Sequence, residues 1–271
     1  MKISIFERPL IMAHRGFQSQ FPENTMAAFS AAAQAGAQYI EMDVSFTQDC
    51  QVVVIHDNTV DRTTNGTGPV HGYLLKELKQ LDAGSWFHPR FAQERVPTLG
   101  EVLDRFAGKI CLNVEIKSYE QASDKGPKQI EQAVVDLVSR KKKQACVLIS
   151  SFDPKVLHNV KKLDQATRVA FISKYFLPGE TVAQCMELNA FSYHPNLSFL
   201  ERHQVKAMHQ EGFQVFPYNI NTAEDIYHAF KLEVDGLISK DPFLVQSCYT
   251  NLLTPKSKNN SDKGATLCER T

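Results

Sequence analysis

The sequence lacks the features that mark several common protein classes. It has six cysteines in 271 residues but no Cys-x-x-Cys pair, which argues against a zinc site or a disulfide framework and favours reduced thiols. No apolar run is long enough to span a bilayer, and the N-terminal stretch MKISIFERPLIMAHRG has no apolar segment of signal-peptide length. These absences predict a cytoplasmic protein without a membrane anchor.

Neither positive nor negative charge is in excess. Thirty basic and thirty acidic residues cancel at pH 7, so the composition gives no reason to expect nucleic acid or an anionic membrane as a partner. A chain of 271 residues is long enough to bury a large core. We therefore expect a globular protein that acts on a small molecule.

Short apolar segments alternate with helical patterns along the chain, which is typical of parallel strands joined by helices. The candidate strands are residues 10–14, 39–44, 110–117, 145–150, 168–172, 190–193, 213–218 and 234–238. Eight such strands predict an α/β fold, a (β/α)8 TIM barrel. The helical pattern in PENTMAAFSAAAQAG has Asn24 as its expected N-cap and Gly36 just past its last turn.

One connection is too long for a simple crossover. Residues 47–108, between the second and third strands, hold another strand-like run (VVVIHD), a Gly-rich turn (TTNGTG) and Trp86, the only tryptophan. This pattern predicts a small insertion over one end of the barrel, in which Trp86 packs against the barrel or lines its mouth. We expect a single catalytic domain over residues 1–250 and a disordered tail over 251–271, which is polar and without periodicity.

Acidic residues occupy strand positions that should face inward. Because side chains alternate along a strand, Glu41 and Asp43 share one face in YIEMDV. Glu115 and Lys117 share a face in NVEIK. If the two strands are neighbours, three carboxylates converge at the carboxyl end of the barrel, where the active sites of such barrels lie. Oxygen ligands without histidine or cysteine favour Mg2+ or Ca2+.

Two histidines and an arginine are expected at the same end of the barrel. His14 ends the first strand in AHRG, and His56 ends the extra strand in VVVIHD. Arg15 offers a planar fork that suits phosphate, to which Lys117 adds a point charge. A cation, two proton-transferring groups and two basic side chains suit the hydrolysis of a phosphodiester.

Several short words of the sequence occur together in a recognisable order. AHRG and PENT are followed by EMDV, by HD with RTTNGTG, and by LDAGSWF, VPTL and EIK. This ordered set resembles the glycerophosphodiester phosphodiesterase family, in particular its short cytoplasmic bacterial members, and the resemblance runs over about residues 8–242. The resemblance implies a TIM barrel that uses a divalent cation to hydrolyse glycerophosphocholine, glycerophosphoethanolamine and similar diesters to sn-glycerol 3-phosphate and an alcohol.

The resemblance also implies roles for individual residues. It assigns the metal to Glu41, Asp43 and Glu115, acid and base catalysis to His14 and His56, and phosphate binding to Arg15 and Lys117. Near the seventh strand the chain reads FPYNIN, so Phe216, Tyr218 and Asn219 are candidates for the substrate wall. After the eighth strand it reads SKDP where relatives have Thr-Asp-x-Pro, a departure that leaves the metal ligands untouched.

Other functions fit the residues less well. A glycosidase needs carboxylates on opposite sides of a bond, whereas Glu41 and Asp43 lie along one strand. A zinc amidohydrolase needs two adjacent histidine ligands on the first strand, which has only His14. A non-catalytic metal- or phosphate-binding relative and a phosphodiesterase that cleaves lysophospholipids stay open. His194, which follows the sixth strand in SYHPN, has no assigned role.

Overall fold

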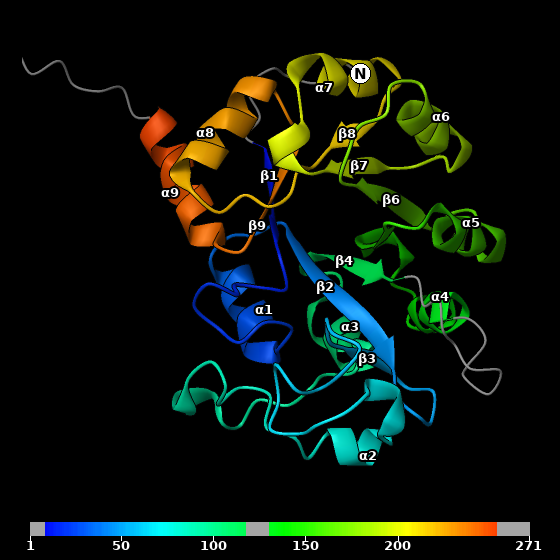
Figure 1. Ribbon diagram of the computed structural model, residues 1–271, viewed down its shortest axis with the longest axis vertical. Coiled ribbons are helices and arrows are strands. Elements are labelled where there is room, and N and C mark those ends of the chain that lie inside the picture. The colour runs from blue at the N-terminus through cyan, green and yellow to red at the C-terminus, as the bar shows by residue number, and fades with distance from the viewer. Residues whose placement is uncertain (1–8, 118–129, 254–271) are drawn as a thin grey trace, which may run out of the picture.

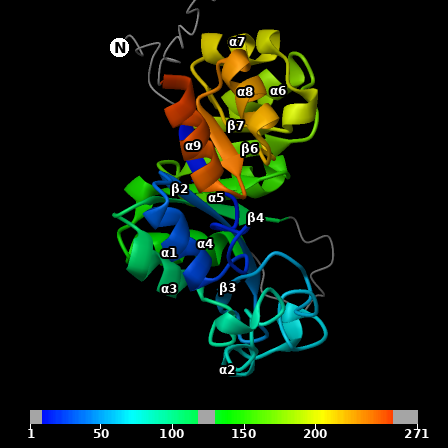
Figure 2. The ribbon, with the colours of Figure 1, turned by 90° about the vertical axis from the view of Figure 1, so that its left-hand side faces the viewer.

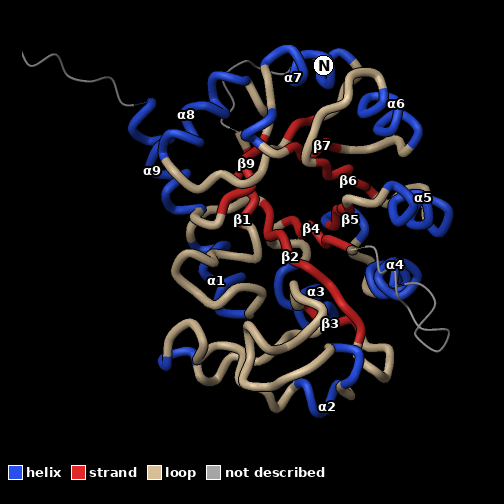
Figure 3. Tube along the Cα trace, in the orientation of Figure 1, coloured by secondary structure: helices blue, strands red, loops and turns tan. Residues whose placement is uncertain are grey.

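The computed structural model describes residues 9–117 and 130–253. Its main sheet contains eight parallel strands that curve into a nearly closed barrel, seen as the ring of strands in Figure 3. In sheet order they are β8 (Gln214–Val215), β7 (Ser192–Pro195), β6 (Arg168–Ser173), β5 (Val147–Ser151), β4 (Cys111–Ile116), β2 (Tyr39–Phe46), β1 (Leu10–Ala13) and β9 (Gly236–Ser239). The ring closes between β8 and β9 through a single bridge, Ile220 to Ser239. The predicted (β/α)8 barrel is confirmed.

Helices surround the barrel on the outside (Figure 1). They are α1 (Met26–Gln34), α3 (Leu99–Phe106), α4 (Ile130–Arg140), α5 (Pro154–Leu163), α6 (Glu180–Glu187), α7 (Arg202–Gln210), α8 (Ala223–Leu232) and α9 (Pro242–Leu253). Within the described ranges, no helix combines the length and the hydrophobicity needed to cross a bilayer. The disordered tail was predicted from residue 251, but α9 continues through Leu253. The rest of the predicted tail, residues 254–271, lies outside the described part of the chain.

The strands separate two apolar layers. Outward-facing residues such as Ile40, Met42 and Val114 pack against the helices in the larger core. Inward-facing residues such as Tyr39 and Phe216 fill the amino-terminal half of the barrel. Along β2, Tyr39 is followed on the same inward face by Glu41 and Asp43. The barrel interior therefore changes from apolar to polar toward the carboxyl ends of its strands, where a site can form.

The expected insertion lies between β2 and β4 and projects from the lower part of the molecule in Figure 2. It contains β3 (Val52–Val54), which pairs antiparallel with β2, the short helix α2 (Leu75–Leu78) and the 3-10 turns η1 (Val70–Gly72) and η2 (Pro89–Phe91). Two further 3-10 turns, η3 (Gln144–Cys146) and η4 (Leu197–Phe199), lie outside the insertion. The insertion has its own small core, which includes Val53, Ile55 and Val60. Trp86 packs edge-on against Phe87 and is 40% exposed.

The start of α1 corrects one sequence prediction. The N-cap is Thr25, whose hydroxyl accepts from the backbone N–H of Ala28, and not Asn24. Asn24 has a left-handed backbone (φ 56°), and its amide donates to Asp43 Oδ2 at 3.0 Å. Asparagine tolerates this conformation better than most residues, so the chain uses it to reach the strand while the next residue caps the helix. Gly36 does follow the helix with positive φ, as predicted.

Replacing Thr25 with Ala should destabilise the fold. The Thr25 hydroxyl is buried, donates to the Pro22 carbonyl at 2.7 Å and caps α1, so Thr25→Ala should lower the free energy of unfolding by about 1 kcal/mol or more. Thr25→Ser retains the hydroxyl and should cost less. Urea unfolding followed by circular dichroism measures both variants, and equal losses would contradict the assignment of Thr25 as the cap.

Candidate active site

The acidic residues of β2 and β4 meet at the carboxyl end of the barrel. Glu41 and Asp43 face inward because side chains alternate along β2, and their neighbour Met42 packs in the outer layer. The register of the sheet pairs Asp43 with Glu115 on β4. Each of the three carboxylates offers an oxygen that lies within 4.8 Å of the others. The convergence expected from the sequence is therefore present.

Burial leaves this acidic cluster electrostatically unbalanced. Burial and the charge of Asp43 raise the pKa of Glu41 well above its usual value, and they raise the pKa of Glu115 to about 7. Burial acts on Asp43 in the same direction, but Lys117 and Arg15 outweigh it and hold the pKa of Asp43 below its usual value. More positive charge is needed if all three carboxylates are to be ionised at neutral pH.

The donor set fits a hard divalent cation. All of its ligand atoms are carboxylate oxygens, which Mg2+ and Ca2+ prefer. The Oε1 atom of Glu41 is buried and has no hydrogen-bond partner among the described residues. Such an unpaired buried oxygen is costly unless a ligand completes it. Glu41, Asp43 and Glu115 are the residues that would hold the ion.

His14 follows β1 and lies beside this cluster, with Nε2 3.8 Å from Glu41 Oε2. The amide nitrogen of Gln18 donates to the backbone oxygen of His14 at 3.0 Å and lies 2.6 Å from Nδ1. Because a carbonyl oxygen can only accept, the amide nitrogen must face this side, so Nδ1 accepts as well. Burial and then Arg15 lower the pKa of His14 to about 4. The ring is therefore neutral at pH 7 and carries its hydrogen on Nε2.

His56 follows β3 in the insertion and is held in the opposite way. Its Nδ1 lies 2.5 Å from Asp57 Oδ1, and hydrogen bonds from Arg62 hold the pKa of Asp57 below its usual value. An ionised carboxylate can only accept, so the hydrogen of a neutral His56 ring is on Nδ1. Its Nε2, 3.9 Å from Asp43 Oδ1, keeps a free lone pair. His14 thus presents an N–H to the site, and His56 presents an acceptor.

An ion-pair network joins the segments that carry the two histidines. Arg62 Nε donates to Asp57 Oδ2 at 2.6 Å, and its terminal nitrogens donate to the two oxygens of Glu23 at 2.9 and 2.8 Å. Glu23 also accepts from Arg15 at 2.8 Å, and Arg15 Nε lies 3.3 Å from Asp43. The network fixes the insertion, and with it His56, to the barrel. Sequence reasoning missed Glu23 and Arg62 because their pairing joins segments 39 residues apart in the chain. It missed Asp57, which is close in sequence to both of its partners, because its role depends on side-chain geometry.

The two expected phosphate ligands lie at the same cluster. Lys117 Nζ is 3.2 Å from Asp43 Oδ1 and donates to the His56 carbonyl at 2.6 Å. The backbone N–H of Arg15 donates to Glu41 Oε2 at 2.7 Å, and Arg15 is among the residues that line the pocket described next. Lys117 is not among the described residues that line that pocket. Both cations stabilise the ionised form of Asp43 in the present arrangement.

An open pocket of about 210 Å³ holds the two histidines and two of the acids, Glu41 and Glu115. Tyr218 and Asn219 line it, as expected, whereas Phe216 is fully buried in the barrel interior and does not reach it. Asn113, Phe152 and His194 also line the pocket. Two features of the sequence could have identified these residues. Asn113 shares a strand face with Glu115, and His194 directly follows a predicted strand.

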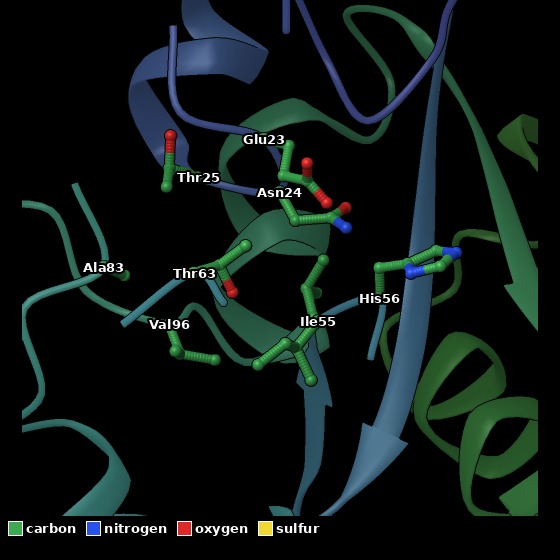
Figure 4. A pocket seen from close by; sticks show the side chains of 9 residues that line it. Glu23, Asn24, Thr25, Ile55, His56, Thr63, Ala83 and Val96 are labelled. Carbon is green, nitrogen blue, oxygen red and sulfur yellow. The ribbon is translucent and has the colours of Figure 1, made fainter. Parts of the chain in front are cut away.

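A second, much smaller cavity lies behind His56 (Figure 4). Its volume is about 10 Å³. Glu23 and Asn24 line it on one side, and Ile55 and Thr63 of the insertion line it on the other. This space suits about one water molecule. It separates the insertion from the loop before α1 and is too small for an organic substrate.

Fold and site together define a class of protein. The pocket lies at the carboxyl end of a (β/α)8 barrel and combines an acidic cluster, two histidines and two basic side chains. Such a site is suited to an enzyme that acts on an anionic small molecule such as a phosphate ester, because cations can stabilise the charge that develops on the phosphate oxygens.

Comparisons with known proteins narrow this class. Residues 14–244 match the sequence model of the glycerophosphoryl diester phosphodiesterase family. The chain is 38% identical over 236 residues to a glycerophosphodiester phosphodiesterase of Caldanaerobacter subterraneus, covering 87% of this chain and 95% of the relative. It is 31% identical over 254 residues to one of Bacillus subtilis, covering 88% and 85% of the two chains.

A solved structure agrees with these sequences. A phosphodiesterase of Oleispira antarctica, in complex with its product sn-glycerol-3-phosphate, superimposes with a TM-score of 0.81 at 30% identity, covering 89% of this chain and 97% of that one. The chain belongs to the glycerophosphoryl diester phosphodiesterase family. It is an enzyme of the phosphoric diester hydrolase class, as the sequence resemblance implied.

Binding of a divalent cation should depend on pH in a defined direction. A protonated carboxyl group cannot ligate, and burial raises the pKa of Glu115 to about 7 and that of Glu41 well above its usual value, so the affinity for Mg2+ should rise by about tenfold or more between pH 6 and pH 8. Calorimetric titration of the cation-free protein at three pH values measures this. Glu115→Gln removes one of the two titrating ligands, serves as the control and should bind more weakly with a smaller dependence on pH. An affinity of the unmodified protein that is the same at pH 6 and pH 8 would contradict the assignment.

Proposed function

We propose that this enzyme hydrolyses glycerophosphodiesters such as glycerophosphocholine and glycerophosphoethanolamine to sn-glycerol 3-phosphate and an alcohol, with the help of a divalent cation. The observation that carries the proposal is the convergence of Glu41, Asp43 and Glu115 beside two histidines held in opposite hydrogen-bonding states. The bound sn-glycerol-3-phosphate of the Oleispira antarctica relative supports the choice of substrate class. Location in the cytoplasm stays a prediction from the sequence.

The cation, Mg2+ or Ca2+, supplies positive charge that stabilises the phosphate oxygens in the transition state. Glu41, Asp43 and Glu115 would hold it. Arg15 and Lys117 offer further positive charge to the phosphate, and they keep Asp43 ionised so that it can ligate. Tyr218 and Asn219 form part of the pocket wall and would contact the organic groups of the substrate.

The hydrogen-bond partners of the histidines favour different roles for them. His56, with its Nδ1 hydrogen directed at Asp57, has a free Nε2 lone pair and would take a proton from the attacking oxygen. His14, with Nδ1 accepting from Gln18, would present its Nε2–H to the leaving alkoxide. The attacking oxygen comes from water or from a hydroxyl of the glycerol group itself. In either case the proton leaves the attacking oxygen for His56, and the P–O bond to the alcohol breaks. Attack by water gives sn-glycerol 3-phosphate directly, whereas attack by the glycerol hydroxyl gives a cyclic phosphate that water then opens to sn-glycerol 3-phosphate.

Substrate and cation dependence can be tested together. The purified enzyme should release sn-glycerol 3-phosphate from glycerophosphocholine and glycerophosphoethanolamine with Mg2+ or Ca2+ present and not with EDTA, because the buried acids need the cation charge. An enzyme-coupled assay of the product measures this. Full activity in EDTA would remove the cation from the proposal. Turnover confined to lysophospholipids would change the substrate, and no turnover of either class would favour a non-catalytic relative.

The two histidine roles should separate when the leaving group changes. An alkoxide needs a proton donor but p-nitrophenolate does not, so His14→Ala should lose roughly 100-fold or more on glycerophosphocholine and much less on the p-nitrophenyl ester of glycerol phosphate. His56→Ala should lose activity on both, because the attacking oxygen is the same. His71→Ala, an exposed histidine of the insertion, is the matched control. Equal losses for His14→Ala on both esters would overturn the assignment of roles.

A further inference from the structure

His194 is a buried polar residue of the pocket that the proposed reaction leaves unused. It lies on β7 and points to the inside of the barrel with Ser192, while Tyr193 between them packs in the outer core. Its side chain is fully buried, and its ring stacks on Phe216 with centroids 5.5 Å apart and planes 4° from parallel. His194 thus lies between the apolar filling of the barrel and the open pocket.

One ring nitrogen of His194 is unpaired within the described part of the chain. Nε2 lies 2.9 Å from the hydroxyl of Ser192, whereas Nδ1 is buried and has no hydrogen-bond partner among the described residues. A buried ring nitrogen without a hydrogen bond destabilises the fold. A ring that served only to pack the barrel interior would not need such a nitrogen. A residue that lines a substrate pocket and keeps one polar atom free is arranged for a ligand.

The position of His194 indicates which part of a ligand it meets. Three strands separate β7 from β2 in either direction around the barrel, so His194 faces the strand of Glu41 and Asp43 from the opposite side. A phosphate held at the acidic cluster would extend an organic group toward β7. Burial lowers the pKa of His194 to about 3, so the ring is neutral and has no charge with which to attract an anion.

We propose that His194 Nδ1 hydrogen-bonds a hydroxyl of the glycerol group and so selects glycerol phosphates over phosphates of simple alcohols. This inference rests on the proposed function for the identity of the substrate. A hydroxyl group both donates and accepts, so it can pair with Nδ1 in either tautomer that Ser192 allows. The alcohol group is assigned to the outer part of the pocket, where Phe152 is 50% exposed and packs against Tyr218.

The test compares the binding of two phosphates to the protein with Mg2+ present. The wild-type protein should bind sn-glycerol 3-phosphate roughly tenfold or more tightly than propyl phosphate, which lacks both hydroxyls. His194→Phe keeps an aromatic ring on Phe216 but removes Nδ1, so this ratio should fall to near one while propyl phosphate binds as before. His194→Asn, which places an amide near the position of Nδ1, should retain part of the preference. His158→Phe, a histidine on α5 that is not among the described pocket residues, is the control.

Calorimetry measures the affinities, and circular dichroism checks the fold of each variant. If His194→Phe does not fold, the wild-type protein is tested instead with propane-1,2-diol phosphate and propane-1,3-diol phosphate, each of which lacks one of the two glycerol hydroxyls. The compound that lacks the hydroxyl bound by His194 should bind about tenfold more weakly than sn-glycerol 3-phosphate, and it should not change the 15N shift of His194 Nδ1. A wild-type protein without preference for glycerol phosphate, or a His194→Phe variant that keeps it, would overturn the proposal. A preference that depends on His194 in a protein without diesterase activity would support the subsite and refute the proposed function instead.

Discussion

The balance of charge around Glu41 and Asp43 of β2 is the constraint on which the rest of the site depends. Glu41 and Asp43 are each only 2% exposed, and a third carboxylate, Glu115, is paired beside Asp43. Buried like charges are unstable unless cations compensate them. Arg15 and Lys117 compensate Asp43 and leave Glu41 and Glu115 with raised pKa values. The remaining imbalance makes the cluster suited to a divalent ion, while Arg15 and Lys117, which follow β1 and β4, both contact Asp43.

Of the two histidines proposed to transfer protons, the barrel itself brings only His14 to this cluster. His56 comes from the insertion, whose own apolar core lies apart from that of the barrel. The insertion is joined to the barrel by the pairing of β3 with β2, by Glu23 between Arg15 and Arg62, and by the Lys117 bond to the His56 carbonyl. Arg62 also donates to Asp57, which in turn accepts the hydrogen bond from His56 Nδ1. A fold with many possible functions therefore acquires His56, the second of the two histidines proposed to transfer protons, through one long connection.

Much of this arrangement could be predicted from the sequence because it rests on local periodicity. The alternation in YIEMDV and NVEIK placed the acids on the inward face, and strand counting identified the barrel. The strand pattern at residues 213–218 shortened to β8 because the chain there pairs by single bridges and not by a ladder. Asn24 was mistaken for a cap because its bond to Asp43 crosses from a loop to a strand. The partners of the histidines, Gln18 and Asp57, were missed as well: they are close in sequence, but their role depends on side-chain geometry that no periodicity encodes.

Anomalous diffraction from crystals soaked in Mn2+ and sn-glycerol 3-phosphate would locate the cation. One strong manganese peak should lie within about 2.3 Å of oxygens of Glu41, Asp43 and Glu115, with a phosphate oxygen as a further ligand. The peak should be lost in Glu41→Gln crystals. A manganese ion bound elsewhere in the pocket, or a phosphate bound at Arg15 with no ion beside the three carboxylates, would contradict the claim that their buried charge exists to hold a cation.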